Sequence, residues 1–293
     1  MFFTEKPLIT EMGPGVYSIN CLGMQAPLLL VGTEKALLLD TGTGNVDVRA
    51  VAESLTDKPI LVALTHEHGD HIGGICQFEE VYVPEKELET IQSTTTAFMQ
   101  SFLDFYNRYL DEGDGVNGCF RQQRELLTWE KLPRLLPFGD GCRFELGNRT
   151  VTAYHCPVHS PGHMVFVDDL SRTCYGGDSI GEQIGPANNP MNPPTIVSLE
   201  RELWGIRHLL EHRGEFDRII GGHPCPLERQ VTMEPSVLTR LEKVGASALA
   251  GKLPFYEEDD PGMGKRSYAQ IGETRLYFFK EYLFEKDIPE KYR

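Results

Sequence analysis

The feature that most constrains this chain is an apolar run that ends directly in a cluster of histidines. Residues 60–65 read ILVALT, and His66, His68, Asp70 and His71 follow within six positions. A short, wholly apolar run is typical of a strand buried on both faces, which requires a packed layer on either side. Imidazole and carboxylate groups are ligands that suit zinc, iron or manganese. The run therefore predicts a layered chain that holds metal at a strand end.

The spacing of these four side chains indicates how they could share metal. Alternate residues of an extended segment project to one side, so His66 and His68 would point the same way. A turn at Gly69 would then aim Asp70 and His71 at an adjacent point. A solvated polar loop is the alternative, but three of the nine histidines of the chain fall within these six residues. The pattern favours two metal ions held side by side.

Strand and helix patterns interleave along the rest of the chain, which favours α/β layers. The predicted strands are 16–20, 27–31, 36–40, 60–65, 81–83, 143–146, 150–155, 165–168, 173–175 and 216–221, with a hairpin at 267–271 and 275–279. The predicted helices are 45–55 with Asn45 as N-cap, 122–132, 198–212, and one from Pro235 to about Ala250.

Residues 85–135 differ in character and predict a helical insertion. Their apolar stripe at helical spacing consists of Phe98, Phe102, Phe105 and Tyr109. Such a stripe could pack on the core, cover a pocket as a lid, or face a second subunit. We therefore expect a core over residues 1–230 that carries this insertion, and a C-terminal extension of helix plus hairpin over 231–293.

Charge and cysteine usage limit the partners and the compartment. Lys and Arg number 28 and Asp and Glu number 43, which gives a net charge of −15 that would repel nucleic acid and anionic lipid. No stretch approaches the ~18 apolar residues of a membrane span, and the first residues do not resemble a signal peptide. The seven cysteines are scattered without a CxxC pair. We expect a cytoplasmic protein with a small-molecule partner and no nucleic-acid or membrane partner, and leave a homodimer open.

The motif LTHEHGDHIGG resembles the His-x-His-x-Asp-His signature of the metallo-β-lactamase-fold hydrolases. Further motifs of that family follow in order, with Asp40 in LLLDTGTG, His159 in CPVHSPGH, Asp178 in YGGDS and His223 in IIGGHPCP. The CPVHSPGH segment also contains His163, which stays the alternative to His159. The resemblance covers roughly residues 14–228 and implies a four-layer αβ/βα sandwich, the metallo-β-lactamase fold.

The resemblance also implies two divalent metal ions, zinc first, with iron or manganese as alternatives. One ion would be held by His66, His68 and His159, and the other by Asp70, His71 and His223, with Asp178 bridging. Asp40 would orient a ligand imidazole from outside. Two divalent ions, two aspartates and one hydroxide leave a charge of about +1, which would attract a carbonyl-bearing or anionic ligand despite the acidic chain.

The implied activity is that of a dizinc metallohydrolase. A metal-bridged hydroxide would attack the carbonyl of a small-molecule ester, thioester or lactone, and Asp70 would accept its proton as a catalytic role. The branch that this chain resembles contains hydroxyacylglutathione hydrolases and lactonases. A mononuclear iron oxidoreductase of the persulfide-dioxygenase type and a phosphodiesterase are the alternatives.

Other side chains have less specific interpretations. A lactonase would place an aromatic hydroxyl near the metals, for which Tyr106, Tyr109 and Tyr175 are candidates. His208 and His212 are four apart on a predicted helix, beside its apolar face, and are expected at a solvated surface. His155 is expected to be a hydrogen-bonded structural residue. The sequence identifies no substrate-binding residue.

Overall fold

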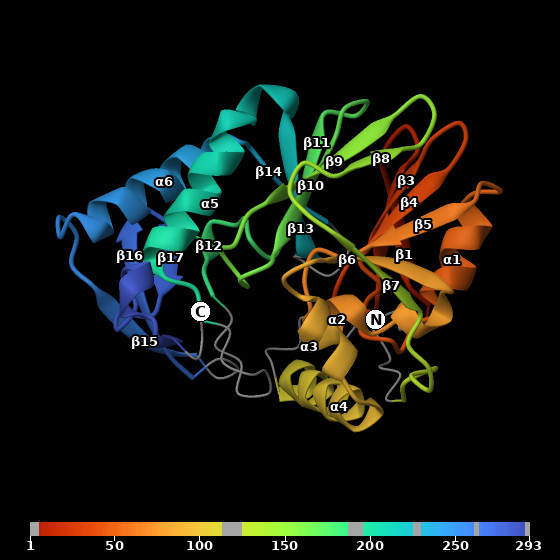
Figure 1. The fold of residues 1–293 in the computed structure, drawn as a ribbon, viewed down its shortest axis with the longest axis horizontal. Helices are drawn as coiled ribbons and strands as arrows, with labels where there is room; N and C mark the ends of the chain where they lie inside the picture. The colour runs from red at the N-terminus through yellow and green to blue at the C-terminus, as the bar shows by residue number, and fades with distance from the viewer. Residues whose placement is uncertain (1–5, 113–124, 187–195, 225–229, 261–263, 291–293) are drawn as a thin grey trace.

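The computed structural model describes residues 6–112, 125–186, 196–224, 230–260 and 264–290, and Figure 1 shows two large sheets packed against each other. The first sheet has seven strands in chain order: β1 (Leu8–Gly13), β2 (Val16–Asn20), β3 (Leu28–Val31), β4 (Ala36–Leu39), β5 (Ile60–Ala63), β6 (Glu80–Pro84) and β7 (Arg134–Phe138). Its first four strands pair antiparallel, and the strands from β4 to β7 pair parallel. The apolar run that precedes the histidines is therefore a strand of the parallel half.

The second sheet has six strands in the order β14-β13-β11-β10-β9-β8. Their bounds are β8 (Arg143–Glu145), β9 (Thr150–His155), β10 (Met164–Asp168), β11 (Thr173–Gly177), β13 (Arg218–Pro224) and β14 (Gln230–Met233). The two sheets share one apolar cluster, in which Leu37 and Leu39 of β4 meet Phe166 of β10. Burial of these side chains between the sheets supplies a large part of the hydrophobic stabilisation.

Helices cover the outer face of each sheet, so the layers run helix, sheet, sheet, helix (Figure 1). On the first sheet, α1 (Val48–Leu55) buries Val48 and Ala52 in one cluster with Val62 of β5. On the second, α5 (Leu199–Glu211) and α6 (Ser236–Leu249) share a cluster with residues of β10 and β11. The four-layer αβ/βα sandwich implied by the resemblance is confirmed.

The start of α1 corrects one prediction. Asp47, and not Asn45, is the N-cap, because its Oδ1 accepts a hydrogen bond from the Ala50 N–H at 2.9 Å. Asn45 is buried instead, and Thr43 Oγ1 lies 2.6 Å from its Oδ1. Both side chains can cap a helix, but that of Asn45 contacts Thr43 and Met24 instead.

The insertion contains two helices, α3 (Leu88–Ser93) and α4 (Thr96–Glu112), which lie at one end of the sheets beside the short helix α2 (Gly69–Ile72) (Figure 1). Phe102 is buried and Phe98 packs against the first-sheet cluster, so this part of the stripe faces the core. The helix predicted over 122–132 is absent from its described part, residues 125–132. There the backbone bonds to other segments, as where the Leu127 N–H donates to the Gly44 carbonyl at 2.9 Å.

A third sheet of four strands lies beyond α6, in the order β12-β17-β16-β15. Its strands are β12 (Gln183–Ile184), β15 (Tyr256–Asp260), β16 (Gly264–Ile271) and β17 (Thr274–Phe278), of which β16 and β17 form the predicted hairpin. Strand β12 comes from the middle of the chain and pairs in parallel with β17, which ties the extension to the core. The domain boundary at residue 230 stays a prediction. Among the described residues, no helix has the length and apolarity that crossing a membrane requires.

Candidate metal centre

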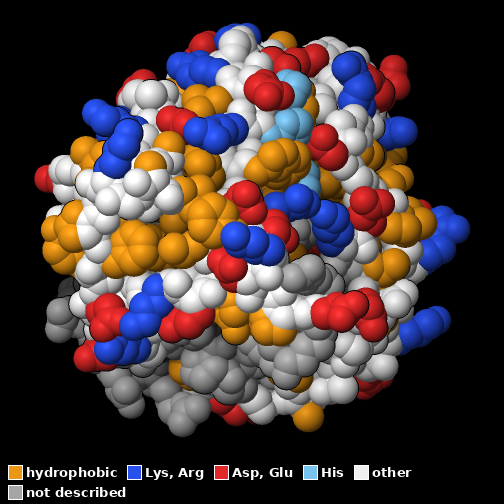
Figure 2. All heavy atoms as spheres, turned by 60° about the vertical axis from the view of Figure 1, so that its left-hand side comes forward, with side chains coloured by type: hydrophobic (Ala, Val, Ile, Leu, Met, Phe, Trp, Pro, Cys, Tyr) orange, Lys and Arg blue, Asp and Glu red, His pale blue; other side chains and the backbone are white. Residues whose placement is uncertain are grey.

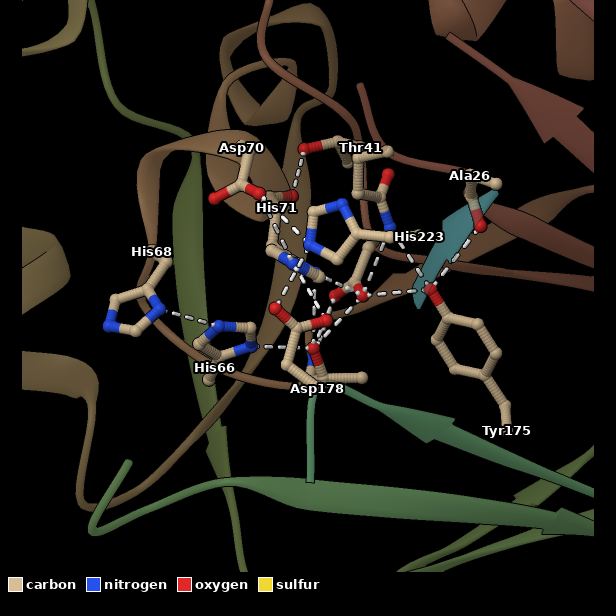
Figure 3. A network of polar contacts seen from close by, with 12 residues as sticks. Ala26, Thr41, His66, His68, Asp70, His71, Tyr175, Asp178 and His223 are labelled. Carbon is tan, nitrogen blue, oxygen red and sulfur yellow. Dashed lines mark hydrogen bonds and ion pairs between the residues drawn. The ribbon is translucent and has the colours of Figure 1, made fainter. Parts of the chain in front are cut away.

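The structure brings the seven predicted ligands together in two groups. Figure 3 labels all of them except His159. The first group is His66, His68 and His159, and the second is Asp70, His71, Asp178 and His223. Within each group the candidate ligand atoms all lie within 4.8 Å of one another. Both groups could hold a metal ion.

The segment after β5 supplies one side of both groups. His66 and His68 follow the strand, and the N–H groups of His71 and Ile72 donate to the His68 carbonyl at 2.9 and 3.1 Å, which begins α2. At Gly69 an added Cβ would lie 2.7 Å from the ring of Phe102. Helix α4 therefore packs on this turn so closely that only glycine fits without movement.

The second sheet supplies the opposite side. His159 lies in the loop between β9 and β10, Asp178 directly follows β11, and His223 lies near the end of β13. These positions are at the carboxyl ends of their strands, as is the segment after β5. Each group consequently takes ligands from both sheets.

Short distances join the side chains within and between the groups. His68 Nδ1 lies 2.9 Å from His66 Nε2 and 3.0 Å from His159 Nε2. Asp178 Oδ2 lies 3.5 Å from His159 Nε2 and 3.0 Å from His223 Nε2. This carboxylate therefore approaches an imidazole of each group.

Hydrogen bonds from outside fix the ring orientation of two of these histidines. His159 Nδ1 donates to the Gly185 carbonyl at 3.1 Å, and His223 Nδ1 donates to the Met24 carbonyl at 2.6 Å. A carbonyl oxygen only accepts, so the proton of each neutral ring sits on Nδ1 and the lone pair on Nε2 faces the group. These are the tautomers that a metal ligand needs.

Asp40 holds a third histidine, His71. Its Oδ2 accepts from His71 Nδ1 at 2.8 Å, and its Oδ1 accepts from the Thr65 N–H at 2.7 Å. The Tyr175 hydroxyl donates to Asp40 Oδ2 at 3.2 Å. Asp40 also has a φ of +63°, an uncommon value for a residue other than glycine. Asp40 thus contacts the His71 ring on the side away from Nε2, and the Tyr175 hydroxyl contacts Asp40.

Burial and nearby carboxylates act in opposite directions on the two groups. Burial lowers the pKa of His66 and of His68 well below the usual value, which favours the neutral, metal-binding form. Burial also opposes charge on His223, but Asp178 and Asp70 raise its pKa to about 9. The second group therefore attracts positive charge.

Two buried atoms of the second group lack a hydrogen bond. His71 Nε2 and Asp178 Oδ1 lie 3.4 Å apart, and neither has a hydrogen-bond partner among the described residues. Buried polar atoms are usually satisfied, so such a pair needs an explanation. One nitrogen and one carboxylate oxygen that face each other fit a divalent cation between them.

The other histidines lie outside both groups. His163 Nε2 accepts from the Asp178 N–H at 3.1 Å, so it supports the backbone of Asp178. His155 Nε2 donates to the Pro161 carbonyl at 2.9 Å, which is the structural role predicted for it. His208, on α5, contacts Asp140, and His212, which follows the last residue of that helix, contacts Glu215. Figure 2 shows that some histidine side chains reach the surface of the face it turns toward the viewer. The His208 side chain is only 17% exposed and is thus more covered than predicted.

Tyr106 and Tyr109, two of the tyrosine candidates, lie outside the residues whose side chains the structure describes. Sequence reasoning missed the roles of Met24 and Gly185, since these residues act through backbone carbonyls that no residue type marks. It also missed Thr65, although a hydroxyl at the end of an apolar strand, next to the first histidine, is a signal that could have been used.

Comparison with known sequences gives one family and several named relatives. A sequence model of the metallo-beta-lactamase superfamily matches residues 22–223. Acyl-coenzyme A thioesterase MBLAC2 of Homo sapiens is 27% identical over an alignment of 187 residues that covers 58% of this chain and 65% of that protein. The Gallus gallus protein of that name is 27% identical, and the alignment covers 76% of this chain and 80% of that protein. Atrochrysone carboxyl ACP thioesterase dmxR1 of Cryptosporiopsis sp. is 26% identical over 59% of this chain and 42% of its own length.

Comparison with solved structures supports the fold. ST1585 of Sulfolobus tokodaii, described as an archaeal metallo-beta-lactamase superfamily protein, matches with a TM-score of 0.53 and 19% identity over 79% of this chain and 86% of its own. The sec-alkylsulfatase Pisa1 of Pseudomonas sp. matches with a TM-score of 0.61 and 16% identity over 84% of this chain and 42% of its own. At these identities the likeness extends to the fold alone.

Proposed function

Because this chain belongs to the metallo-beta-lactamase superfamily, we propose that it is a metal-dependent hydrolase of acyl thioesters. The observation that carries the proposal is that its relatives include thioesterases named for two carriers, coenzyme A and an acyl carrier protein. Both carriers present the acyl group as a thioester of a phosphopantetheine thiol. The chain spans 65% of the length of the human relative, so the substrate is inferred from the shared thioester chemistry.

The two groups are proposed to hold two divalent ions, zinc first, with iron or manganese as alternatives. His66, His68 and His159 would hold one, and Asp70, His71 and His223 the other, with Asp178 between them. The nitrogen and carboxylate donors and the unpaired His71 Nε2 and Asp178 Oδ1 support this assignment. When bound, such ions would lower the pKa of a water molecule and polarise the substrate carbonyl.

The chain's own residues would orient the ligand rings, balance the charge of the ions and accept a proton. Asp178 lies between His159 of the first group and His223 of the second, and its charge would partly neutralise both ions. Asp70 is proposed to take up the proton of the attacking water, since its Oδ2 lies within the second group, 3.3 Å from His223 Nε2. Asp40 keeps the His71 ring aimed by its bond to Nδ1. The five described cysteines are free, which fits the proposed cytoplasmic compartment.

One substrate panel tests this function. Purified protein would be assayed for thiol release from an acyl-coenzyme A and from a short acyl-pantetheine thioester, beside a lactone and an aryl phosphodiester. We expect thioester hydrolysis that is lost on chelation and restored by Zn²⁺. Faster phosphodiester cleavage, or one equivalent of iron with oxygen consumption, would instead support the phosphodiesterase or the persulfide-dioxygenase alternative.

A further inference from the structure

A buried glutamate outside the two groups contacts the loop that carries His159. Glu87 lies between β6 and α3 and is 2% exposed. Its Oε1 accepts from Ser160 Oγ at 2.7 Å and from the Gly162 N–H at 2.6 Å. Two short bonds thus join the insertion to the residues that flank a candidate metal ligand.

The packing around these bonds leaves the loop little freedom. An added Cβ at Gly162 would lie 2.5 Å from Glu87 Oε1, so the backbone approaches the carboxyl where a side chain would stand. On the other side, the Cys156 N–H donates to the His163 carbonyl at 2.9 Å and closes the base of the loop. The side chain of Glu87 makes no capping bond to α3, although the residue precedes that helix. Its position is explained by the loop and not by the helix.

We propose that Glu87 is a positioning residue of the metal centre, which sets the His159 imidazole against His66 and His68 by holding Ser160 and Gly162. The inference rests on the proposed metal site and deepens it. It gives the insertion a role, which is to support the loop that carries His159.

To hold this loop, the side chain at position 87 has to supply an oxygen that accepts two hydrogen bonds, and it does not have to be charged. Burial raises the pKa of Glu87 to about 7, while the bonds from Ser160 and Gly162 act to lower it. An amide oxygen in the same place accepts the same two hydrogen bonds. Glu87→Gln should therefore preserve the loop, whereas Glu87→Ala leaves two buried donors unpaired.

Glu202 supplies a matched control. It is a second fully buried glutamate, on α5, and neither of its carboxyl oxygens has a hydrogen-bond partner among the described residues. Glu202→Ala removes the same atoms from the interior without removing a bond to the His159 loop. General effects of deleting a buried carboxyl are thereby separated from the positioning effect.

The experiment measures metal binding in a His223→Ala background, in which the second group is disabled. Competition with a chromogenic chelator gives the Zn²⁺ affinity of the remaining group, and the visible absorption of bound Co²⁺ reports its coordination. We expect Glu87→Ala to weaken Zn²⁺ binding by about 10- to 100-fold, the range typical of residues that orient a ligand, and to alter the Co²⁺ spectrum. The Zn²⁺ affinities of Glu87→Gln and Glu202→Ala should stay within about threefold of that of the His223→Ala background, which is well below a loss of about 10-fold.

Unchanged Zn²⁺ affinity and an unchanged Co²⁺ spectrum in Glu87→Ala would overturn the proposal, as would an equal loss in Glu202→Ala. If Glu87→Ala does not fold, Ser160→Ala removes only one of the two bonds and should give a smaller loss in the same direction. No loss in Ser160→Ala would then count against the positioning role. Because the readout is metal binding, the result does not depend on thioester hydrolysis.

Discussion

His71 Nδ1 lies 2.8 Å from Asp40 Oδ2, and neither side chain is exposed to solvent. Asp40 follows β4 and His71 lies in α2, so the bond fixes the short helix to the carboxyl end of this central strand. A second bond between the same segments runs from the Thr41 N–H to the His71 carbonyl at 2.8 Å. The imidazole is thus held from behind while its Nε2 faces the second group.

Asp40→Asn tests this support. The amide keeps the size of the side chain but removes the charge that orients His71, so we expect metal affinity in the second group to fall by about 10- to 100-fold. Equilibrium dialysis followed by metal analysis measures it. Asp47→Asn is the control, since Asp47 caps α1 away from the site. Equal affinities in both variants would refute the assigned role.

His68→Ala removes the nitrogen that lies closest to both other members of the first group. We expect thioester hydrolysis to fall by more than about 100-fold, because loss of a ligand exceeds the usual effect of losing its outer partner. Steady-state kinetics with added Zn²⁺ measures the loss. The same substitution at His208, on α5, should leave the rate unchanged, and a comparable loss there would indicate a general effect on folding.

Glu202→Met tests the cost of a buried, unpaired carboxyl. Burial raises the pKa of Glu202 well above 4.5. The folded state therefore binds this proton more tightly than the unfolded state, and the contribution of Glu202 to wild-type stability falls as pH rises above about 4.5. We expect the variant to gain about 1–3 kcal/mol in the free energy of unfolding at pH 7, and the gain to shrink toward pH 4.5.

Urea denaturation at several pH values measures this difference. Glu211→Met on the exposed side of the same helix is the control, and should change the free energy of unfolding by less than about 0.5 kcal/mol. A gain in Glu202→Met that does not depend on pH would contradict the explanation by ionisation.

Gly69→Ala tests the contact between α2 and α4. The new Cβ would lie 2.7 Å from a ring carbon of Phe102, and overpacking of this kind costs about 1–3 kcal/mol. Combining it with Phe102→Leu should recover part of that cost, since the smaller side chain leaves room for the methyl group. Chemical denaturation of the single and double variants gives the coupling free energy. Strict additivity would show that the two residues do not compete for space.

Local sequence predicted the part of the candidate site whose residue types and spacing carry the chemistry. His66, His68, Asp70 and His71 follow an apolar strand within six residues, and the structure brings them to one edge of the sheets. The pairing of His159 with this segment is not local, and only the order of family motifs indicated it.

What the sequence could not predict depends on contacts between distant segments. The carbonyls of Met24 and Gly185 act through backbone atoms that are the same in every residue. The helix predicted over 122–132 fails in its described part because the Leu127 N–H bonds to Gly44, far away in sequence. Glu87 resembles an ordinary surface glutamate until the fold buries it beneath the His159 loop.

Each group of candidate ligands spans the boundary between the two sheets. His66 and His68 belong to one half of the sandwich and His159 to the other, as Asp70 and His71 stand opposite Asp178 and His223. An ion in either place would therefore act as a cross-link between the halves, and its binding free energy would add to the free energy of unfolding. By the same linkage, the free energy of unfolding would rise with the concentration of free metal.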